Sequence, residues 1–275
     1  MTKVWSVVSW NVCHAGSGYG GEDLNGSLAA IPSKSRETIS NLYNRSKDYK
    51  YHQPEVIFLC EILNVDGRVL KGWTPPGYKL VDIVYGYDKS TALRYCLYVA
   101  EKHFPIPVRV LKTGFTRPAV AIEIDGRWIM FIHAPSKKFI KSEGVSSNHG
   151  AYQAHVINEA QKNWSNWPYD KIAAVVGDLN VNFDDNLQMV TFGSYLKSPF
   201  AEFRAAAPRM ATHVKGSQLD WAIYDPESFF WPNVTAFNPQ STMEIEGDEW
   251  SPAGESGPKN SDHSAIVFSW TNVSS

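Results

Sequence analysis

The sequence predicts an α/β domain in which two β-sheets pack face to face and helices cover their outer faces. Short apolar runs rich in β-branched and aromatic residues recur along the chain, which is typical of buried strands. Two stretches carry apolar residues at helical spacing, and strands mixed with few helices favour packed sheets with helices outside. No composition shift marks a boundary, so we expect residues 1–275 to form a single domain.

The predicted strands are short apolar segments between polar, Gly- or Pro-containing stretches, and their lengths favour strands over helices. In chain order they are Val4–Val12, Val56–Leu59, Tyr95–Val99, Ala119–Ile124, Trp128–His133, Ile172–Val176, Leu219–Tyr224 and Ala265–Trp270.

The predicted helices are Lys34–Tyr51 and Ala151–Asn166. Asn25–Ser35 and Phe237–Asn260 are predicted to be loops. The second contains Pro, Gly, Ser and acidic residues without periodicity, and loops of that length in compact domains are often functional.

Composition restricts the class of protein but not its substrate. Hydrophobic residues make up 43% and charged residues 20%, which is ordinary for a globular protein and excludes a disordered polymer. The formal net charge of −2 gives no whole-chain cationic field for nucleic acid, so a nuclease of this composition needs a local basic strip.

The cysteines and the apolar segments give information on the cellular compartment of the protein. The three cysteines, Cys13, Cys60 and Cys96, are widely spaced and form no disulfide framework or paired metal motif. There is no signal-peptide pattern at the start of the sequence and no apolar run of about 18 residues, so we expect no membrane span. A cytoplasmic protein and a delivered or secreted effector both stay open.

Polar side chains follow the predicted strands at the points where the apolar runs stop. They are Asn11 in SWNV, Glu61 in VIFLCEI, His133 in IMFIHAP, Asp178 and Asn180 in VVGDLN, Asp220 in QLDWAIY, and Asp262 and His263 in NSDHSAIVF. Strand ends along one sheet edge can converge, so these residues could form one polar cluster over a hydrophobic base.

Taken singly, these residues have ordinary structural explanations. An Asn or Asp at a strand end is usually a turn former, and a lone His in an apolar strand is more often a satisfied core residue. Glu61 is harder to explain in this way, because a Glu directly after VIFLC is costly to bury without a cation or a partner.

Together and in this order, the motifs resemble those of the endonuclease/exonuclease/phosphatase superfamily. The set comprises WN, a Glu closing the second strand, GDxN, LDxxxY and a terminal SDH, and it spans Trp10 to His263. The resemblance implies a four-layered α/β sandwich of two mixed β-sheets flanked by helices, as in deoxyribonuclease I.

His133 places the resemblance nearest the branch of deoxyribonuclease I and the cytolethal distending toxin catalytic subunit. The stretch RPAVAIEIDGRWIMFIHAPS, from Arg117 to Ser136, and the stretch GSQLDWAIY are similar to that branch. One position departs from it: Leu93 in TALRYCLYV stands where deoxyribonuclease I has a Glu that orients its first catalytic His. Either another acceptor orients His133, or the position comparable to that Glu lies a residue or two from Leu93.

The resemblance also implies roles for the polar residues in phosphodiester hydrolysis. His263 would be the general base with Asp220 holding its tautomer, and His133 would be the general acid or a donor to the phosphate. Asp178, Asn180 and Asp262 would position the water, the metal shell and the phosphate.

A divalent cation and two arginines complete the predicted site. Oxygen ligands from Glu61 and Asn11, with Asp262 in the shell, suit Mg²⁺ or Mn²⁺, and Ca²⁺ is not distinguished from them. Arg94 and Arg117 are predicted phosphate contacts because guanidinium groups bind phosphate oxygens bidentately; a surface salt bridge is the alternative for each.

These residues predict a divalent-metal-dependent phosphodiesterase. The preferred hypothesis is a DNA endonuclease of low sequence specificity, such as a toxin or effector nuclease with DNA as its substrate. The alternative is a phosphatase or phosphodiesterase acting on phosphoinositide, sphingomyelin or another small phosphate ester, since fold does not fix substrate. An inactive scaffold is disfavoured because the metal Glu, both His and the GDxN pair are present. A delivery or immunity partner has no visible interface in the sequence.

Overall fold

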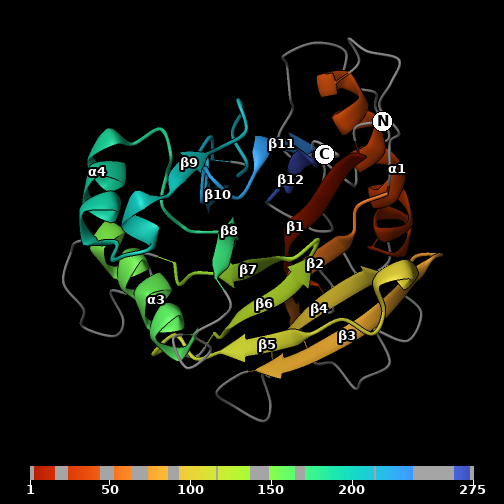
Figure 1. The fold of residues 1–275 in the computed structure, drawn as a ribbon, viewed down its shortest axis with the longest axis horizontal. Coiled ribbons are helices and arrows are strands. Elements are labelled where there is room, and N and C mark those ends of the chain that lie inside the picture. The colour runs from red at the N-terminus through yellow and green to blue at the C-terminus, as the bar shows by residue number, and fades with distance from the viewer. Residues whose placement is uncertain are drawn as a thin grey trace.

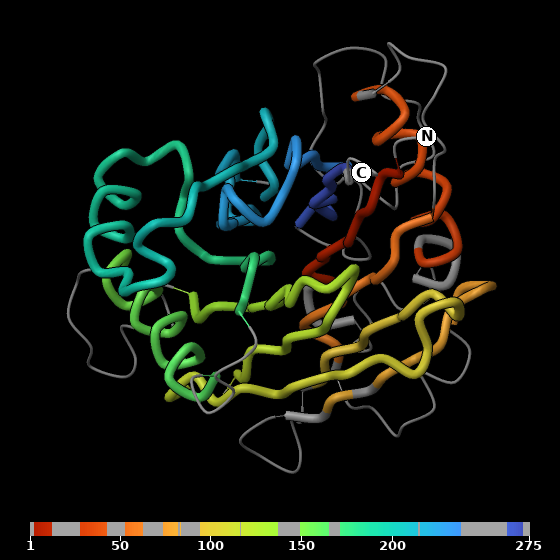
Figure 2. The backbone as a smooth tube through the Cα atoms, viewed as in Figure 1, coloured from red at the N-terminus to blue at the C-terminus, as the bar shows by residue number. Residues whose placement is uncertain are grey.

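The computed structural model describes residues 3–15, 24–43, 53–63, 74–85, 93–115, 117–136, 149–164, 171–213, 215–237 and 263–272. These residues form two six-stranded mixed sheets with helices outside them, which confirms the predicted four-layered α/β sandwich (Figures 1 and 2). None of the described helices is long and apolar enough to cross a membrane.

The first sheet has the strand order β11-β12-β1-β2-β4-β3. Its strands are β1 (Lys3–Ala15), β2 (Val56–Leu63), β3 (Tyr78–Tyr85), β4 (Leu93–Ala100), β11 (Phe230–Phe237) and β12 (Ala265–Asn272). Only β1 and β2 run parallel among its pairs.

The second sheet has the order β5-β6-β7-β8-β10-β9. Its strands are β5 (Val108–Leu111), β6 (Ala119–Ile124), β7 (Arg127–His133), β8 (Ile172–Asp178), β9 (Arg204–Ala206) and β10 (Asp220–Tyr224). Here β7 and β8 are the parallel pair, so both sheets have two parallel strands near their centres.

The described helices are α1 (Leu24–Tyr43), α3 (His149–Trp164) and α4 (Asn186–Tyr195), with the 3-10 turns η2 (Glu101–His103) and η3 (Phe200–Glu202). Three hydrophobic clusters fill the interfaces between the four layers. The cluster between the sheets includes Val7, Phe58, Phe131, Val176 and Phe268. Leu28, Ile31 and Ile39 of α1 pack on the outer face of the first sheet, and Tyr152, Val156 and Ile157 of α3 on that of the second.

The predicted strands are confirmed, but the loop predicted at Asn25–Ser35 is wrong, because these residues lie inside α1. Leu28 and Ile31 are buried one turn apart against the first sheet, and this burial stabilises a helix that contains Pro32. The predicted helix Lys34–Tyr51 is confirmed as far as Tyr43, and its remaining residues lie outside the described part of the chain.

The second predicted helix is confirmed, with bounds shifted by two residues. Ala151–Asn166 corresponds to α3, and Phe237 ends β11. Residues 238–260 of the predicted long loop lie outside the described residues.

Candidate active site

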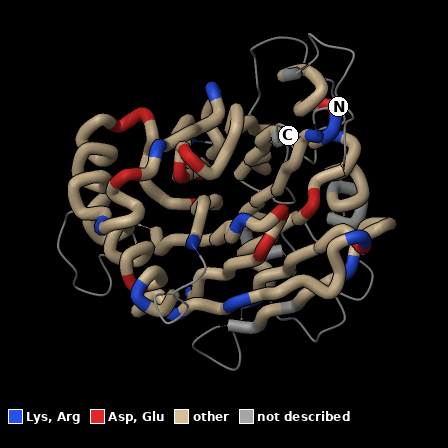
Figure 3. The backbone as a smooth tube through the Cα atoms, viewed as in Figure 1, with Lys and Arg blue, Asp and Glu red and all other residues tan. Residues whose placement is uncertain are grey.

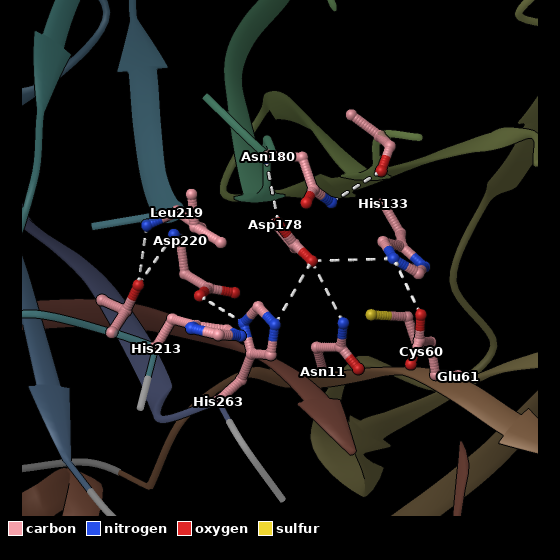
Figure 4. Close-up of polar contacts among 12 residues, drawn as sticks. Asn11, Cys60, Glu61, His133, Asp178, Asn180, His213, Leu219, Asp220 and His263 are labelled. Atoms are coloured by element: carbon pink, nitrogen blue, oxygen red, sulfur yellow. Dashed lines mark hydrogen bonds and ion pairs between the residues drawn. The ribbon is translucent and has the colours of Figure 1, made fainter. Parts of the chain in front are cut away.

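The predicted polar residues converge at one edge of the sandwich, where strands of the two sheets end side by side (Figure 4). The first sheet supplies Asn11 from β1, Glu61 from β2 and His263 just before β12, whereas the second supplies His133 from β7, Asp178 from β8 and Asp220 from β10. A hydrogen bond from Asn11 Nδ2 to Asp178 Oδ2, 3.0 Å long, joins the two sheets within the cluster.

His263 and Asp220 form a buried pair in which the imidazole Nδ1 lies 2.8 Å from Asp220 Oδ2. The carbonyl of His263 accepts a hydrogen bond from Trp10 Nε1 at 3.0 Å, which fixes the backbone that carries the ring. Because an ionised carboxylate can only accept, Asp220 holds the imidazole proton on Nδ1 and directs the Nε2 lone pair towards the cluster. That Nε2 lies 3.9 Å from Asp178 Oδ2.

Asp178 is fully buried at the centre of the cluster. Its Oδ1 accepts a hydrogen bond from the Asn180 backbone N–H at 3.0 Å. Burial raises the pKa of Asp178 to about 7; the protonated form of His263 and the Asn11 hydrogen bond act to lower it, and the Asp220 and Glu61 carboxylates act to raise it. A carboxyl held in this way is stabilised in its charged form by any cation that enters the cluster.

His133 is contacted at Nε2 by three groups of the site. Arg117 Nη1 lies 2.6 Å away, Glu61 Oε1 3.3 Å and Asp178 Oδ2 3.6 Å. A guanidinium only donates, so in the contact with Arg117 the imidazole accepts at Nε2. Leu93, the residue predicted to stand in the place of an orienting Glu, begins β4.

Two site residues adopt the left-handed backbone conformation that residues other than Gly, Asn and Asp seldom adopt. Glu61 has φ 60° and Asn180 has φ 52°. Glu61 lies where the pairing of β2 with β4 shifts register between Leu59 and Ile62. A bulge of this kind re-aims a side chain next to a site, and here it accompanies a Glu that directly follows an apolar run.

The glycine of GDxN is required by close packing of β8 on β7. Gly177 has φ 147°, and a Cβ at this position would lie 2.1 Å from the carbonyl oxygen of Ile132. Because Gly177 has no side chain, its backbone can approach Ile132 closely, and the next residues, His133 and Asp178, pair directly across the two parallel strands.

The structure thus brings together eight of the residues predicted for the site, namely Asn11, Glu61, Arg117, His133, Asp178, Asn180, Asp220 and His263. Arg94 lies on β4 opposite Ile62, one residue from Glu61 along β2. Asp262 lies outside the described residues. The roles of all these residues stay predictions.

Thr212 and His213, which lie in the segment between β9 and β10, are site residues that were not predicted from the sequence. Thr212 is buried, and its Oγ1 accepts hydrogen bonds from the backbone N–H groups of Leu219 and Asp220 at 2.9 and 3.0 Å. The ring of His213 contacts the ring of His263. No motif marks either residue in MATHVKGSQLD, because their places depend on how this segment folds back.

The donor atoms of the cluster fit a hard divalent cation. Ligand atoms of Asp178, Asp220 and His263 all lie within 4.8 Å of one another, and the Glu61 carboxylate lies on the other side of Asp178 near His133. Carboxylate and amide oxygens suit Mg²⁺ or Mn²⁺. Asp220 and His263 already hydrogen bond each other, so Glu61 and Asn11 stay the predicted ligand set.

The two-sheet architecture with this cluster at its edge has the deoxyribonuclease I-like fold of endonuclease/exonuclease/phosphatase proteins. The chain is similar in structure to the cytolethal distending toxin of Haemophilus ducreyi, with a TM-score of 0.53 and 14% identity over 96% of this chain and 97% of that one. It is also similar to the endonuclease domain of TRAS1, a telomere-specific non-LTR retrotransposon, with a TM-score of 0.53 and 12% identity over 97% and 98% of the two chains.

An endonuclease/exonuclease/phosphatase family protein from Leptotrichia buccalis gives a TM-score of 0.56 at 13% identity, over 96% of this chain and 98% of that chain. At these identities the likeness shows the fold, and it confirms the deoxyribonuclease I-like architecture expected from the sequence motifs. No protein-family model and no curated protein sequence matches the chain.

Proposed function

We propose that this protein is a divalent-metal-dependent phosphodiester hydrolase that nicks DNA with low sequence specificity. The observation that carries the proposal is the buried His263–Asp220 pair, 2.8 Å apart, at the same sheet edge as Glu61, His133 and Asp178. This edge offers a base, a second imidazole and carboxylates for a cation, which are the groups that phosphodiester hydrolysis needs.

His263 acts as the general base in this proposal. Its Nε2 takes a proton from the attacking water, while Asp220 holds the Nδ1 tautomer and stabilises the imidazolium that forms. Asp178 Oδ2 lies 3.9 Å from this nitrogen and is fixed by the hydrogen bond from Asn11. Asn180 is joined to Asp178 through its backbone N–H, and in this proposal the two residues orient the water and the phosphate.

His133 and the two arginines act on the leaving oxygen and on the phosphate. In this proposal Arg117, 2.6 Å from His133 Nε2, turns to the phosphate oxygens when substrate binds. His133, protonated at Nε2 beside the Glu61 and Asp178 carboxylates, then donates that proton or a hydrogen bond to the leaving oxygen. Arg94, on the neighbouring strand, is the second arginine we propose for phosphate contact.

Glu61 and Asn11 would hold the cation, with Asp262 in its shell. When bound, a divalent cation neutralises the charge that develops on the phosphoryl oxygens. Arg117 Nη2 lies 3.6 Å from Glu61 Oε1, so the guanidinium and the metal ligands meet at one place where a phosphate can contact both.

The distribution of charged residues favours DNA contacts that are limited to the active site and the residues around it. Basic and acidic residues are interspersed along the described backbone in Figure 3, and the formal net charge is −2. DNA bound in this way is held through its backbone phosphates and is cleaved with little regard to sequence.

Supercoiled-plasmid nicking in Mg²⁺ tests the proposal, with the variants His133→Ala and His263→Ala and a chelator control. We expect nicking that requires the metal and falls in each variant by at least about a hundredfold. His155→Ala, at an exposed position of α3, is the matched control and should nick as wild type. An intact plasmid together with release of phosphate from phosphoinositides or other phosphate esters would refute DNA as the substrate and keep the hydrolase.

A further inference from the structure

The segment between β9 and β10 folds back over the His263–Asp220 pair and is fastened on both sides. Thr212 Oγ1 accepts from the backbone N–H of Asp220 at 3.0 Å, and the Thr212 carbonyl accepts from the backbone N–H of Ser264 at 2.8 Å. His213 forms an isolated antiparallel bridge with His263. The backbone that carries His213 is therefore tied to both members of the pair.

The His213 ring itself lies against the His263 ring. The two centroids are 4.9 Å apart and the ring planes cross at 81°, and Figure 4 shows the two side chains next to each other. The backbone N–H of Lys215 donates to His213 Nδ1 at 3.1 Å, which fixes the orientation of the His213 ring. His213 is half-buried, and its ring covers one side of the His263 ring.

A general-base imidazole has to be held at more than one point. The hydrogen bond to Asp220 fixes Nδ1, but rotation about the terminal torsion of a His side chain is soft, and it moves Nε2 along an arc. A displacement of about 1 Å at a reacting atom lowers the rate by up to about a hundredfold. A ring packed perpendicular to the imidazole opposes this rotation.

We propose that His213 is a positioning residue for the reaction, and that its ring keeps Nε2 of His263 directed at the attacking water. The proposal rests on the proposed hydrolytic function. His213 acts through His263 and does not itself bind the phosphate.

Two substitutions separate the ring contact from the loop anchor. His213→Phe keeps a ring against His263 but loses the acceptor for the Lys215 N–H, whereas His213→Asn keeps an acceptor and loses the ring. We expect His213→Asn to lower kcat by about ten- to a hundredfold with KM changed by less than about twofold, and His213→Phe to keep most of kcat. The opposite ranking would show a loop-anchoring role and overturn the proposal.

A double variant tests whether His213 acts through His263. In a His263→Ala background, His213→Asn should have no further effect on the residual rate, because residues that act as a unit are not additive. A further loss of the same size would show that His213 contacts the substrate directly and would overturn the proposal. His155→Ala serves again as the histidine control, and thermal unfolding verifies that each variant folds.

NMR of ¹⁵N-labelled histidines distinguishes a failure of the proposed function from a failure of this inference. If the wild type cleaves no phosphate ester, the hydrolase proposal fails, and the ring signals of His263 decide on His213. Broadened His263 ring signals in His213→Asn, but not in His213→Phe, support the positioning role. Equally sharp signals in both variants overturn it.

Discussion

Asp220→Asn is the substitution that separates catalysis from folding most clearly at this site. Asp220 Oδ2 accepts from His263 Nδ1 at 2.8 Å, and both side chains are buried. Asparagine has the same shape, but its amide can present N–H to Nδ1 and so move the imidazole proton to Nε2, the atom that must accept a proton. An Asp→Asn change that alters the tautomer of a His base lowers kcat by about 10⁴-fold.

That loss corresponds to about 5 kcal/mol of transition-state stabilisation. Stability should change in the opposite direction or not at all. Ligand atoms of Asp178 and Asp220 lie within 4.8 Å of each other, and two full charges at that distance repel by about 3 kcal/mol at an effective dielectric constant of about 20. Partial protonation of Asp178 reduces this repulsion, so we expect Asp220→Asn to unfold in urea at the same or a slightly higher midpoint than wild type.

The assay is single-turnover cleavage of a labelled DNA duplex, with urea unfolding measured on the same preparation. KM should be nearly unchanged, because Asp220 does not face the substrate. A variant that keeps activity within about tenfold of wild type would refute the tautomer argument. A loss of more than about 2 kcal/mol in the free energy of unfolding would show that the pair is chiefly structural.

The strands that carry the site give two further predictions. Gly177→Ala should lower the free energy of unfolding by at least about 3 kcal/mol, because its Cβ would lie 2.1 Å from the Ile132 carbonyl oxygen; urea titration measures this, and a loss below about 1 kcal/mol would contradict the geometry. Because burial raises the pKa of Asp178 to about 7, above its unfolded value, the stabilising protonated form is lost as pH rises, and stability without metal should fall between about pH 4 and pH 7. Asp178→Asn should flatten this pH dependence in chelator, and an unchanged slope would assign it to other groups.

The sequence was sufficient to predict the buried strands and the ends of those strands that bear polar residues. A run such as Val56–Leu59 is apolar on both faces because β2 is covered by the other sheet on one side and by α1 on the other. Such strands differ sharply in composition from the polar residues at their ends, so Glu61 could be predicted as a site residue from its place directly after this apolar strand. The convergence of the predicted residues followed from strand ends meeting at one edge.

The elements that were not predicted lie at the periphery, where the hydrophobic pattern is weak. They are β3, β5, β9, β11 and α4. In α4 only Phe192 is buried, and Leu187 and Val190 are exposed, so no apolar stripe marks a face that packs on the core. The strands β3, β5, β9 and β11 are edge strands, and an edge strand buries fewer side chains than a central one.

Contacts inside the site could not be predicted from the sequence for a different reason. The pairing of His133 with Arg117 crosses from the end of β7 to the segment before β6, and Thr212 reaches Asp220 only because its segment folds back. Sequence motifs specify residue types at strand ends, but they carry no information on which atoms meet.

The site depends on the packing between the two sheets as much as on its own residues. Glu61 comes from the first sheet and His133 from the second, and three residues before Glu61 along β2 the ring of Phe58 stacks on Phe131 of β7, with centroids 4.9 Å apart. Protein interiors are close-packed and transmit changes in volume. A smaller side chain at Phe131 would therefore let the sheets approach or slide, and the distance between Glu61 and His133 would change although neither residue had been altered. The hydrogen bond from Asn11 to Asp178 spans the same gap, so the geometry proposed for catalysis is set by the hydrophobic layer directly beneath it.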